Sequence, residues 1–513
     1  MTIRISHDKL KNCLNPERIE QVAQQFEGFF KKDFIEQALD EEGVKFRHRD
    51  FPPLETTWSF VTQVLQQDRS CRQAVADTIA AREEHDLPTP SANTGAYCQA
   101  QKRLPETLIV KMTRHIVEEV DGNQQATRWL WRGFNVKLID GTVVDMPDTP
   151  ANRAAFPSET LKSDDTPAGA FPQARIVGIF SLAVGLLLSL SIGPIAGKNS
   201  SENVMVNQLL KDCHSGDLLV FDRYFTGYFN LALMLAGGLA FVSRQHASRC
   251  YNPKANRKAN FAIVKRFNKR DRLIKIEKPW RRHGTWWTDD ADVYDGAPDA
   301  LILREIELTV TRPGFRTQNI VILTSLLDSK AYPANEVAEV YRRRWAVEVD
   351  LKSMKKDLNM ARLRSKTPSM VTKEIWVYTL AYNLIRTLIR QAACLLDINP
   401  IELSFKAAVQ FFLAFRKFLY HLRDKAKRLV CFEKILAAIG SYKVGNRPDR
   451  AEPRAVRQRK RKYPTLTEAR AVARNKPEHY ERIHGHPERR RLKAQDTMPQ
   501  ILKAYSGLGG ARA

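Results

Sequence analysis

The chain has 513 residues, 43% of them hydrophobic, and a formal charge of +25 from 82 Lys and Arg against 57 Asp and Glu. This length predicts about two to four domains, and the hydrophobic content is enough for at least one sizeable core. The excess positive charge indicates a polyanionic partner, of which nucleic acid is the commonest; an anionic membrane surface and a ribosome-like protein are the alternatives.

Three features of the sequence bear on the cellular compartment. The seven cysteines lie far apart without a CxxC pair, which argues against a zinc ribbon and favours reduced thiols in a cytoplasm. The N-terminal residues show no signal peptide. The longest apolar run, 176–192, contains two Gly and three Ser and is slightly short for a membrane span. We predict two buried strands there, with a membrane segment as the less favoured alternative.

The predicted elements fall into five regions. Residues 1–130 have helical periodicity, and a helix over 105–120 would begin at Pro105 and place Leu108, Met112 and Ile116 on one face. Short apolar runs bounded by Gly and Pro predict strands in 131–244. A block rich in strands and basic residues follows at 245–335, and helical periodicity returns in 336–440. The region 441–513 is a basic tail, in which residues 446–513 hold 18 Lys and Arg against 7 Asp and Glu.

Two acidic residues follow apolar runs in the strand-rich region. Asp140 ends the apolar part of FNVKLIDGTVVDM and precedes Gly141 and Thr142, and Asp222 follows LLVF at 218–221. We interpret both as acids at strand ends, where a rigid backbone could bring distant carboxylates together. An acid after a strand is more often only a turn residue, so neither Asp identifies a site by itself.

A third acid stands in the more specific segment YRRRWAVEVDLKSMK, at 341–355. If this segment is one continuous helix, Tyr341, Arg344, Glu348 and Lys355 form a stripe about 60° wide. Such a helix would hold an acid beside two cations and a phenol. An exposed helix with ion pairs is the alternative, because Arg344 and Glu348 are also four residues apart.

This spacing, Tyr-x2-Arg-x3-Glu-x6-Lys, resembles the signature of the insertion-sequence-four family of bacterial DDE transposases. DGT at 140–142 and GDLLVFDRYF at 216–225 resemble the two aspartate motifs of that family. The segments 68–75, 91–105 and 448–462 also resemble family regions, so the likeness covers most of the chain. The resemblance to the family is least specific in the block at 245–335.

The resemblance implies an α/β fold: a ribonuclease-H-like catalytic core with a mixed sheet (131–244 and 336–440), interrupted by a β-rich insertion domain (245–335). It also implies a helical N-terminal DNA-binding domain (1–130) and a basic C-terminal tail. Asp140, Asp222 and Glu348 would be the catalytic metal ligands for Mg²⁺, with Mn²⁺ as a substitute, and Tyr341, Arg344 and Lys355 would contact DNA. Such a metal site activates water or a DNA 3′-hydroxyl without a protein base.

The implied function is cut-and-paste DNA transposition. The implied partners are double-stranded DNA, as terminal inverted repeats and as target, and a second copy of the chain in the DNA complex. Well-studied relatives excise through a DNA hairpin and stack a flipped base on an aromatic residue of the insertion. The implied location is the bacterial cytoplasm, at the nucleoid.

Further DNA contacts are expected in two basic segments. Trp280, Trp286 and Trp287 lie in the insertion beside Arg281 and Arg282, and each Trp is either a packing residue or a stacking partner for a base. The tail carries a cluster that would bind phosphates: Arg457, Arg459, Lys460, Arg461 and Lys462.

Two other functions remain open at this stage. A ribonuclease-H-like nuclease or resolvase would need the same three acids, although the long insertion and the Tyr-Arg-Glu-Lys pattern argue against it. A DNA-binding protein derived from a transposase would need none of them, and all three are present.

Overall fold

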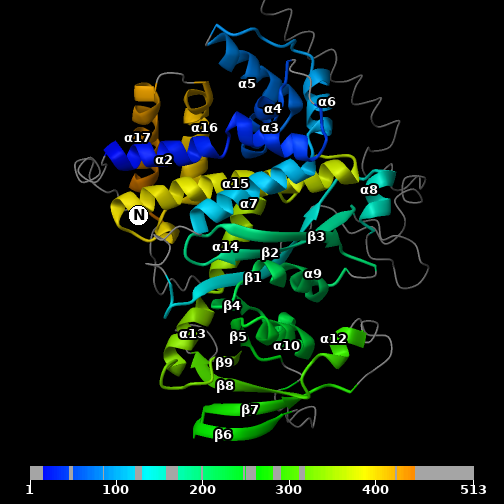
Figure 1. Ribbon diagram of the computed structural model, residues 1–513, viewed down its shortest axis with the longest axis vertical. Helices are drawn as coiled ribbons and strands as arrows, with labels where there is room; N and C mark the ends of the chain where they lie inside the picture. The colour runs from blue at the N-terminus through cyan, green and yellow to red at the C-terminus, as the bar shows by residue number, and fades with distance from the viewer. Residues whose placement is uncertain are drawn as a thin grey trace, which may run out of the picture.

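The computed structural model describes residues 16–45, 50–84, 86–121, 130–157, 171–197, 200–246, 249, 261–280, 291–310, 318–421 and 425–444. These residues form a mixed α/β structure, in which a helical region stands above a large sheet (Figure 1).

The sheet has nine strands in the order β3-β2-β1-β4-β5-β9-β8-β7-β6. The first five come from the region where strands were predicted: β1 (Asn135–Asp145), β2 (Gln173–Ser181), β3 (Leu187–Pro194), β4 (Asp217–Phe221) and β5 (Ala240–Arg244). β1, β2 and β3 pair antiparallel, whereas β4 and β5 run parallel to β1. The sheet is therefore mixed, as predicted.

The strands found between 245 and 335, of which the apolar runs predicted the last two, extend this same sheet. They are β6 (Ala262–Asn268), β7 (Asp271–Glu277), β8 (Ala300–Val310) and β9 (Gln318–Thr324), with the short helix α12 (Ala291–Asp295) between β7 and β8. β9 pairs with β5, so the inserted strands continue from the edge of the first five. Whether they form a domain of their own stays a prediction.

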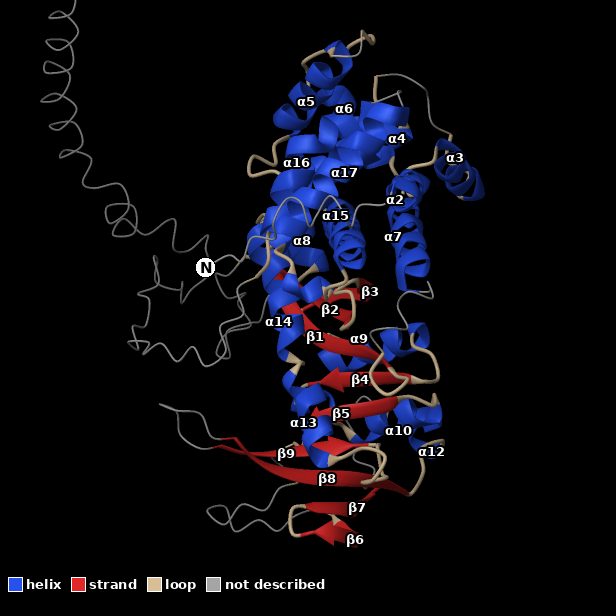
Figure 2. Ribbon diagram, turned by 90° about the vertical axis from the view of Figure 1, so that its left-hand side faces the viewer, coloured by secondary structure: helices blue, strands red, loops and turns tan. Residues whose placement is uncertain are grey.

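Helices cover both faces of the sheet (Figure 2). α9 (Glu202–Leu209) and α10 (Tyr228–Ala236) pack on one face, where Ile139 and Phe221 point. α13 (Ala334–Arg342) and α14 (Trp345–Lys352) lie on the other, where Leu138 and Val220 point. This division follows from strands whose successive side chains point to opposite faces.

The helical region combines segments from both ends of the chain. Its centre is α15 (Pro368–Leu396), a 29-residue helix that packs against α7 (Glu106–Asp121). Leu108, Met112 and Ile116 of α7 are buried, as predicted. The remaining helices are α2 (Pro16–Gly28), α3 (Lys32–Glu41), α4 (Pro53–Leu65), α5 (Cys71–Glu83), α6 (Gly95–Arg103), α8 (Pro150–Ala155), α16 (Phe405–His421) and α17 (Lys425–Ser441).

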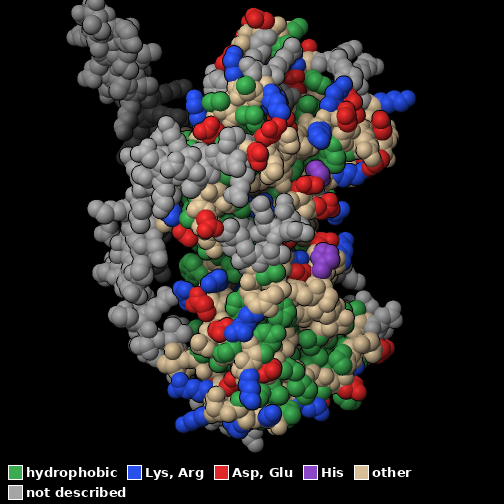
Figure 3. Space-filling model, turned by 60° about the vertical axis from the view of Figure 1, so that its left-hand side comes forward, with side chains coloured by type: hydrophobic (Ala, Val, Ile, Leu, Met, Phe, Trp, Pro, Cys, Tyr) green, Lys and Arg blue, Asp and Glu red, His purple; other side chains and the backbone are tan. Residues whose placement is uncertain are grey.

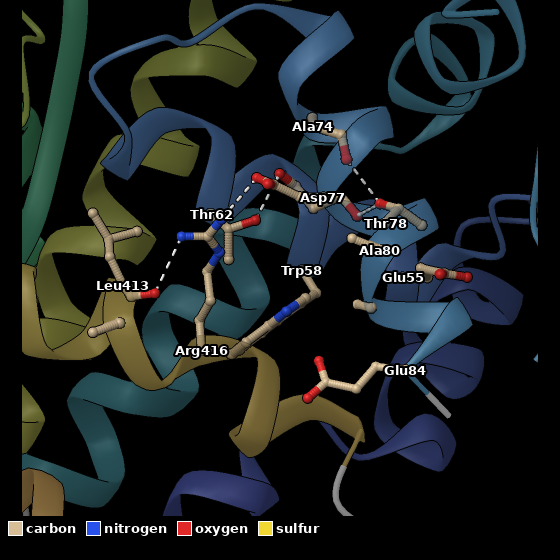
Figure 4. A pocket seen from close by; sticks show the side chains of 13 residues that line it. Glu55, Trp58, Thr62, Ala74, Asp77, Thr78, Ala80, Glu84, Leu413 and Arg416 are labelled. Carbon is tan, nitrogen blue, oxygen red and sulfur yellow. Dashed lines mark hydrogen bonds and ion pairs between the residues drawn. The ribbon is translucent and has the colours of Figure 1, made fainter. Parts of the chain in front are cut away.

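A pocket of about 290 Å³ opens between α4, α5 and α16 (Figure 4). It is lined by Trp58 and by the ion pair of Asp77 with Arg416, whose atoms are 2.8 Å apart. None of the residues predicted to form the catalytic site lines it.

Two expectations about single segments can be settled here. The apolar run 176–192 forms β2 and β3, so the two-strand prediction is confirmed. Among the described residues, no helix is both long and apolar enough to cross a membrane. The interpretation of Asp140 as a strand-end residue is wrong, because β1 continues five residues further, to Asp145. Backbone pairing with β2 continues as far as Asp145 and so extends β1 past Asp140.

A buried ion pair ties the inserted strands to the helices. Arg304 on β8 is fully buried and donates two hydrogen bonds to Asp271 on β7, at 2.8 and 2.6 Å. Its third nitrogen, Nη1, donates to the carbonyl oxygen of Tyr332 at 2.6 Å, just before α13 begins. One side chain thus fixes the approach to the segment that carries Glu348.

Candidate active site

Strand register places Asp140 and Asp222 side by side. In the parallel pair of β1 and β4, the last partners are Ile139 and Phe221. The next residue along each strand is an aspartate, Asp140 within β1 and Asp222 just after β4. Asp222 accepts a hydrogen bond from the backbone N–H of Arg223 at 2.8 Å, and so caps a short 3₁₀ turn. The prediction of a strand-end acid is confirmed for Asp222.

Arg344 joins the third acid to this pair. Its Nη2 donates to Glu348 Oε1 at 2.7 Å, and its Nη1 lies 3.9 Å from Asp140 Oδ2. Arg344 is also close enough to Asp222 for their charges to interact. The three predicted acids therefore surround one guanidinium group at the junction of β1, β4 and α14.

The environment of Asp140 disfavours its charge. Burial raises the pKa of the Asp140 carboxyl, and the neighbouring charges of Glu348 and Glu202 add to the rise. The Gly141 N–H, which donates to Asp140 Oδ1 at 2.9 Å, and the Arg344 guanidinium oppose it. Burial likewise raises the pKa of the Tyr341 hydroxyl, to which the charge of Asp222 contributes. A site with this excess of negative charge would be stabilised by a cation.

Lys355 completes the cluster from a different local structure. Its Nζ donates to Thr142 Oγ1 at 3.1 Å, beside the Asp140 strand. The single helix predicted over 341–355 is wrong: α13 ends at Arg342, Arg343 and Arg344 form a turn, and Ser353–Asp357 form a π-helical turn after α14. In a π-helical turn the angle between successive side chains differs from that of an α-helix, so the stripe calculated for a straight α-helix does not apply there. Tertiary packing nevertheless brings all four side chains of the motif to the two aspartates.

The donor set can be compared with what Mg²⁺ requires. Three carboxylates provide the hard oxygen ligands that Mg²⁺ and Mn²⁺ prefer. Among the described residues, however, no three His, Cys, Asp or Glu side chains are gathered closely enough to form a metal site. Arg344 lies between Asp140 and Glu348, with its nitrogens 3.9 Å from a carboxylate oxygen of Asp140 and 2.7 Å from one of Glu348. Asp140, Asp222 and Glu348 are nevertheless suitable oxygen donors for such an ion.

A second feature adjoins this cluster. A pocket of about 390 Å³ opens next to Arg344 and is lined by apolar residues of β8 and β9 and by Tyr341 and Trp345. Trp345 is 64% exposed, although it directly follows Arg344 in the motif. No feature of the sequence pattern distinguishes Trp345 as a surface residue.

The other predicted DNA contacts are placed only in part. Trp280 is 86% exposed, so its interpretation as a packing residue is wrong; it lies three residues after the end of β7. The following lie outside the described residues: Arg281, Arg282, Trp286, Trp287, Arg457, Arg459, Lys460, Arg461 and Lys462.

Basic side chains are exposed on the hairpin of β6 and β7. Lys265, Arg266, Lys269 and Arg270 are solvent-exposed, and the Nζ of Lys265 lies 5.3 Å from the ring centroid of Phe267. Figure 3 shows basic side chains along this end of the molecule. The arrangement suits a surface that follows a nucleic-acid backbone.

Glu202, the first residue of α9, was not predicted from the sequence. Its carboxylate lies next to Gly141, so that a Cβ on Gly141 would be 3.0 Å from Glu202 Oε1. An acid in the first turn of a helix is common, because it interacts favourably with the helix dipole. Only the packing of α9 on β1 shows that the Glu202 carboxylate points towards Gly141.

Comparison with known proteins supports the interpretation of this geometry. A family model for the transposase DDE domain matches residues 131–384, from just before β1 into α15. Over 445 residues, 85% of this chain and 92% of the relative, the sequence is 28% identical to the transposase InsG for insertion sequence element IS4 of Escherichia coli (strain K12). The chain belongs to the insertion-sequence-four family of DDE transposases. In this transposase, the matched region contains Asp140, Asp222 and Glu348 and all the strands of the sheet.

Proposed function

We propose that this DDE transposase cleaves DNA at the terminal inverted repeats of its own insertion sequence and joins the ends to a target. The observation that carries the proposal is the convergence of Asp140, Asp222 and Glu348 around Arg344. The three acids come from β1, from the residue after β4 and from α14, and are separated by long stretches of sequence between residues 140 and 348. The arrangement of β1 to β5, with an antiparallel trio followed by two parallel strands, supports a ribonuclease-H-like core.

Asp140, Asp222 and Glu348 would hold Mg²⁺, or Mn²⁺ in its place. When bound, the metal would activate the attacking oxygen and stabilise charge on the leaving oxygen. Arg344 pairs with Glu348 and lies near Asp140. We propose that it turns to a DNA phosphate when substrate enters, because a guanidinium matches phosphate geometry. Lys355, beside Thr142, would hold a second phosphate, and Tyr341 would orient Arg344 through their contact.

The pocket beside Arg344 is proposed to receive a nucleotide displaced from the DNA end. Its apolar lining and the exposed ring of Trp345 offer a stacking surface, and Tyr341, Arg342 and Arg344 stand at its wall. Stacking of a base on an aromatic ring contributes about 1–3 kcal/mol. A displaced base near the cut is consistent with excision through a hairpin. Trp280, exposed on the inserted strands, would contact the same DNA further from the cut.

The wider assembly is proposed on the same basis. Two copies would each hold one inverted repeat, and the charge of the 446–513 tail would attract the flanking DNA. The bacterial nucleoid is the expected location, because that is where both ends and the target lie. The N-terminal helices would contribute to binding the ends.

The test is cleavage of labelled DNA that carries the terminal repeat, with Mg²⁺, Mn²⁺ or EDTA. Wild-type protein should cut at the repeat boundary only with metal, and Glu348→Gln should bind the DNA without cutting it. Glu336→Gln is the matched control, since Glu336 lies on α13 and pairs with Arg132 on the surface. Binding without cutting by the wild type under all metals would favour a non-catalytic DNA-binding protein. Cutting by Glu348→Gln at the wild-type rate would remove Glu348 from the site.

A further inference from the structure

Gly141 lies between two acids that approach β1 from opposite faces of the sheet. Glu348 approaches from the α14 face, and Glu202 approaches from the α9 face. Leu138, two residues before Asp140, packs in the core on the α14 side. Ile139, two residues before Gly141, packs in the core on the α9 side, together with Met205 and Val206 of α9. Because side chains alternate along a strand, the missing side chain of Gly141 would point towards α9.

The carboxylate of Glu202 occupies the space of that missing side chain. A Cβ at position 141 would lie 3.0 Å from Glu202 Oε1 and 3.1 Å from its carboxyl carbon. A larger residue would require the Glu202 carboxylate to shift from this position. Glycine thus lets an acid reach the backbone of β1 at the residue whose N–H binds Asp140 Oδ1. The hydroxyl of Ser201 caps α9 and fixes the start of the helix that carries Glu202.

Glu202 is only weakly neutralised where it stands. The nearest cation is Arg175 on β2, whose Nε lies 3.7 Å from Glu202 Oε1, beyond hydrogen-bond distance. The Nη1 of Arg175 is committed to the carbonyl oxygen of Ser200 at 2.7 Å, and its buried Nε has no hydrogen-bond partner. Among the described residues, no other cation forms an ion pair with Glu202. A half-buried acid near Asp140 is thus paired with one arginine without a hydrogen bond between them.

We propose that Glu202 supplies a fourth carboxylate to the divalent-cation site formed by Asp140, Asp222 and Glu348. The inference rests on the proposed function, because it assumes that those three acids hold a metal. Glu202 would add negative charge from the α9 face of β1, while Glu348 adds it from the α14 face. Gly141 would be required at its position because it leaves room for this carboxylate.

The test measures Mn²⁺ binding to the full-length protein without DNA, as the rise in melting temperature with Mn²⁺ concentration above an EDTA baseline. Glu202→Gln should raise the Mn²⁺ concentration for the half-maximal effect by about tenfold or more, since even a residue that only supports a metal ligand typically contributes that much to affinity. Arg175→Gln is the matched control, since it removes the same ion pair and keeps the carboxylate. It should leave Mn²⁺ binding unchanged or tighter.

Gly141→Ala gives an independent variant if Glu202→Gln folds poorly. Its methyl group should displace the Glu202 carboxylate and weaken Mn²⁺ binding in the same way. In a Glu202→Ala background, Gly141→Ala should have no further effect, because no carboxylate is left to displace.

The variant Asp140→Asn distinguishes a failure of the Glu202 proposal from a failure of the proposed metal site. If Asp140→Asn weakens Mn²⁺ binding and Glu202→Gln does not, Glu202 is no part of the site and the inference is overturned, while the proposed function stands. Equal losses in Glu202→Gln and Arg175→Gln would also overturn it, because they would assign the effect to the ion pair. If neither Asp140→Asn nor Glu202→Gln changes Mn²⁺ binding, the proposed metal site itself is wrong.

Discussion

Glu348 owes its position to a buried ion pair two residues further along α14. Asp350 accepts a hydrogen bond from the guanidinium of Arg386 on α15, and both side chains are more than 90% buried. Arg386 also donates to the Tyr382 hydroxyl at 2.9 Å and lies over the rings of Tyr382 and Phe405. The pair therefore fastens the helix of the third acid to the longest helix of the protein.

Asp350→Ala should strongly destabilise this junction. Removing one partner of a buried pair leaves the other charge uncompensated, which costs about 3–5 kcal/mol. The Tyr382 hydroxyl and the two rings remain around Arg386, so we expect the lower part of this range. An exposed pair on the neighbouring helix, Arg342 with Glu339, should contribute only about 0–1 kcal/mol, and Glu339→Ala serves as the control.

The suitable assay is native-state hydrogen exchange of the α14 and α15 amides. A chain of this size need not unfold in one step, and exchange reports the local opening free energy. Asp350→Ala should lower that free energy for α14 and also reduce DNA cleavage, since Glu348 lies on the same helical turn. The double variant Asp350→Leu with Arg386→Met should recover stability, because apolar replacement of a buried pair is often neutral or stabilising.

A loss below about 1 kcal/mol in Asp350→Ala, similar to that in Glu339→Ala, would refute this reasoning. It would mean that water reaches Arg386 or that another acid replaces Asp350. Cleavage at the wild-type rate despite a large loss of stability would show that α14 needs no such anchor to place Glu348.

Three further outcomes are expected from other parts of the protein. Asp140→Asn should raise the melting temperature of the metal-free protein at neutral pH, because burial raises the pKa of Asp140 and its ionised form costs stability. This gain should vanish as the pH falls through the raised pKa towards the unfolded value of about 3.9, where the acid is protonated in both states; a gain independent of pH would contradict it. Arg304→Met should lower the urea midpoint and also loosen the approach to α13, because it leaves Asp271 buried without its partner; an unchanged midpoint would show that this pair does not hold the inserted strands. Removal of 446–513 should weaken DNA binding and flatten the slope of log affinity against log salt, whereas an unchanged slope would show that the tail does not touch phosphates.

The sequence by itself determined most of the secondary structure and the identity of the acids. Apolar runs bounded by Gly and Pro predicted β1 to β5, β8 and β9, because buried strands need continuous apolar residues. The position of Asp222 after LLVF was predicted for the same reason. The motif at 341–355 pointed to Glu348 together with its cationic neighbours, and that spacing is a property of the sequence alone.

Tertiary structure decided how these pieces meet. Backbone pairing with β2 carries β1 past Asp140, and the turn at Arg343 and Arg344 divides the helix that periodicity predicted as continuous. The inserted strands extend the central sheet because β5 offers them an edge, which no local pattern could show. Glu202 shows the same limit most clearly. It is an ordinary helix-start acid in the sequence, and its place beside Asp140 depends on a glycine on a strand more than 60 residues away. Such contacts depend on packing between distant segments, and local residue preferences do not encode them.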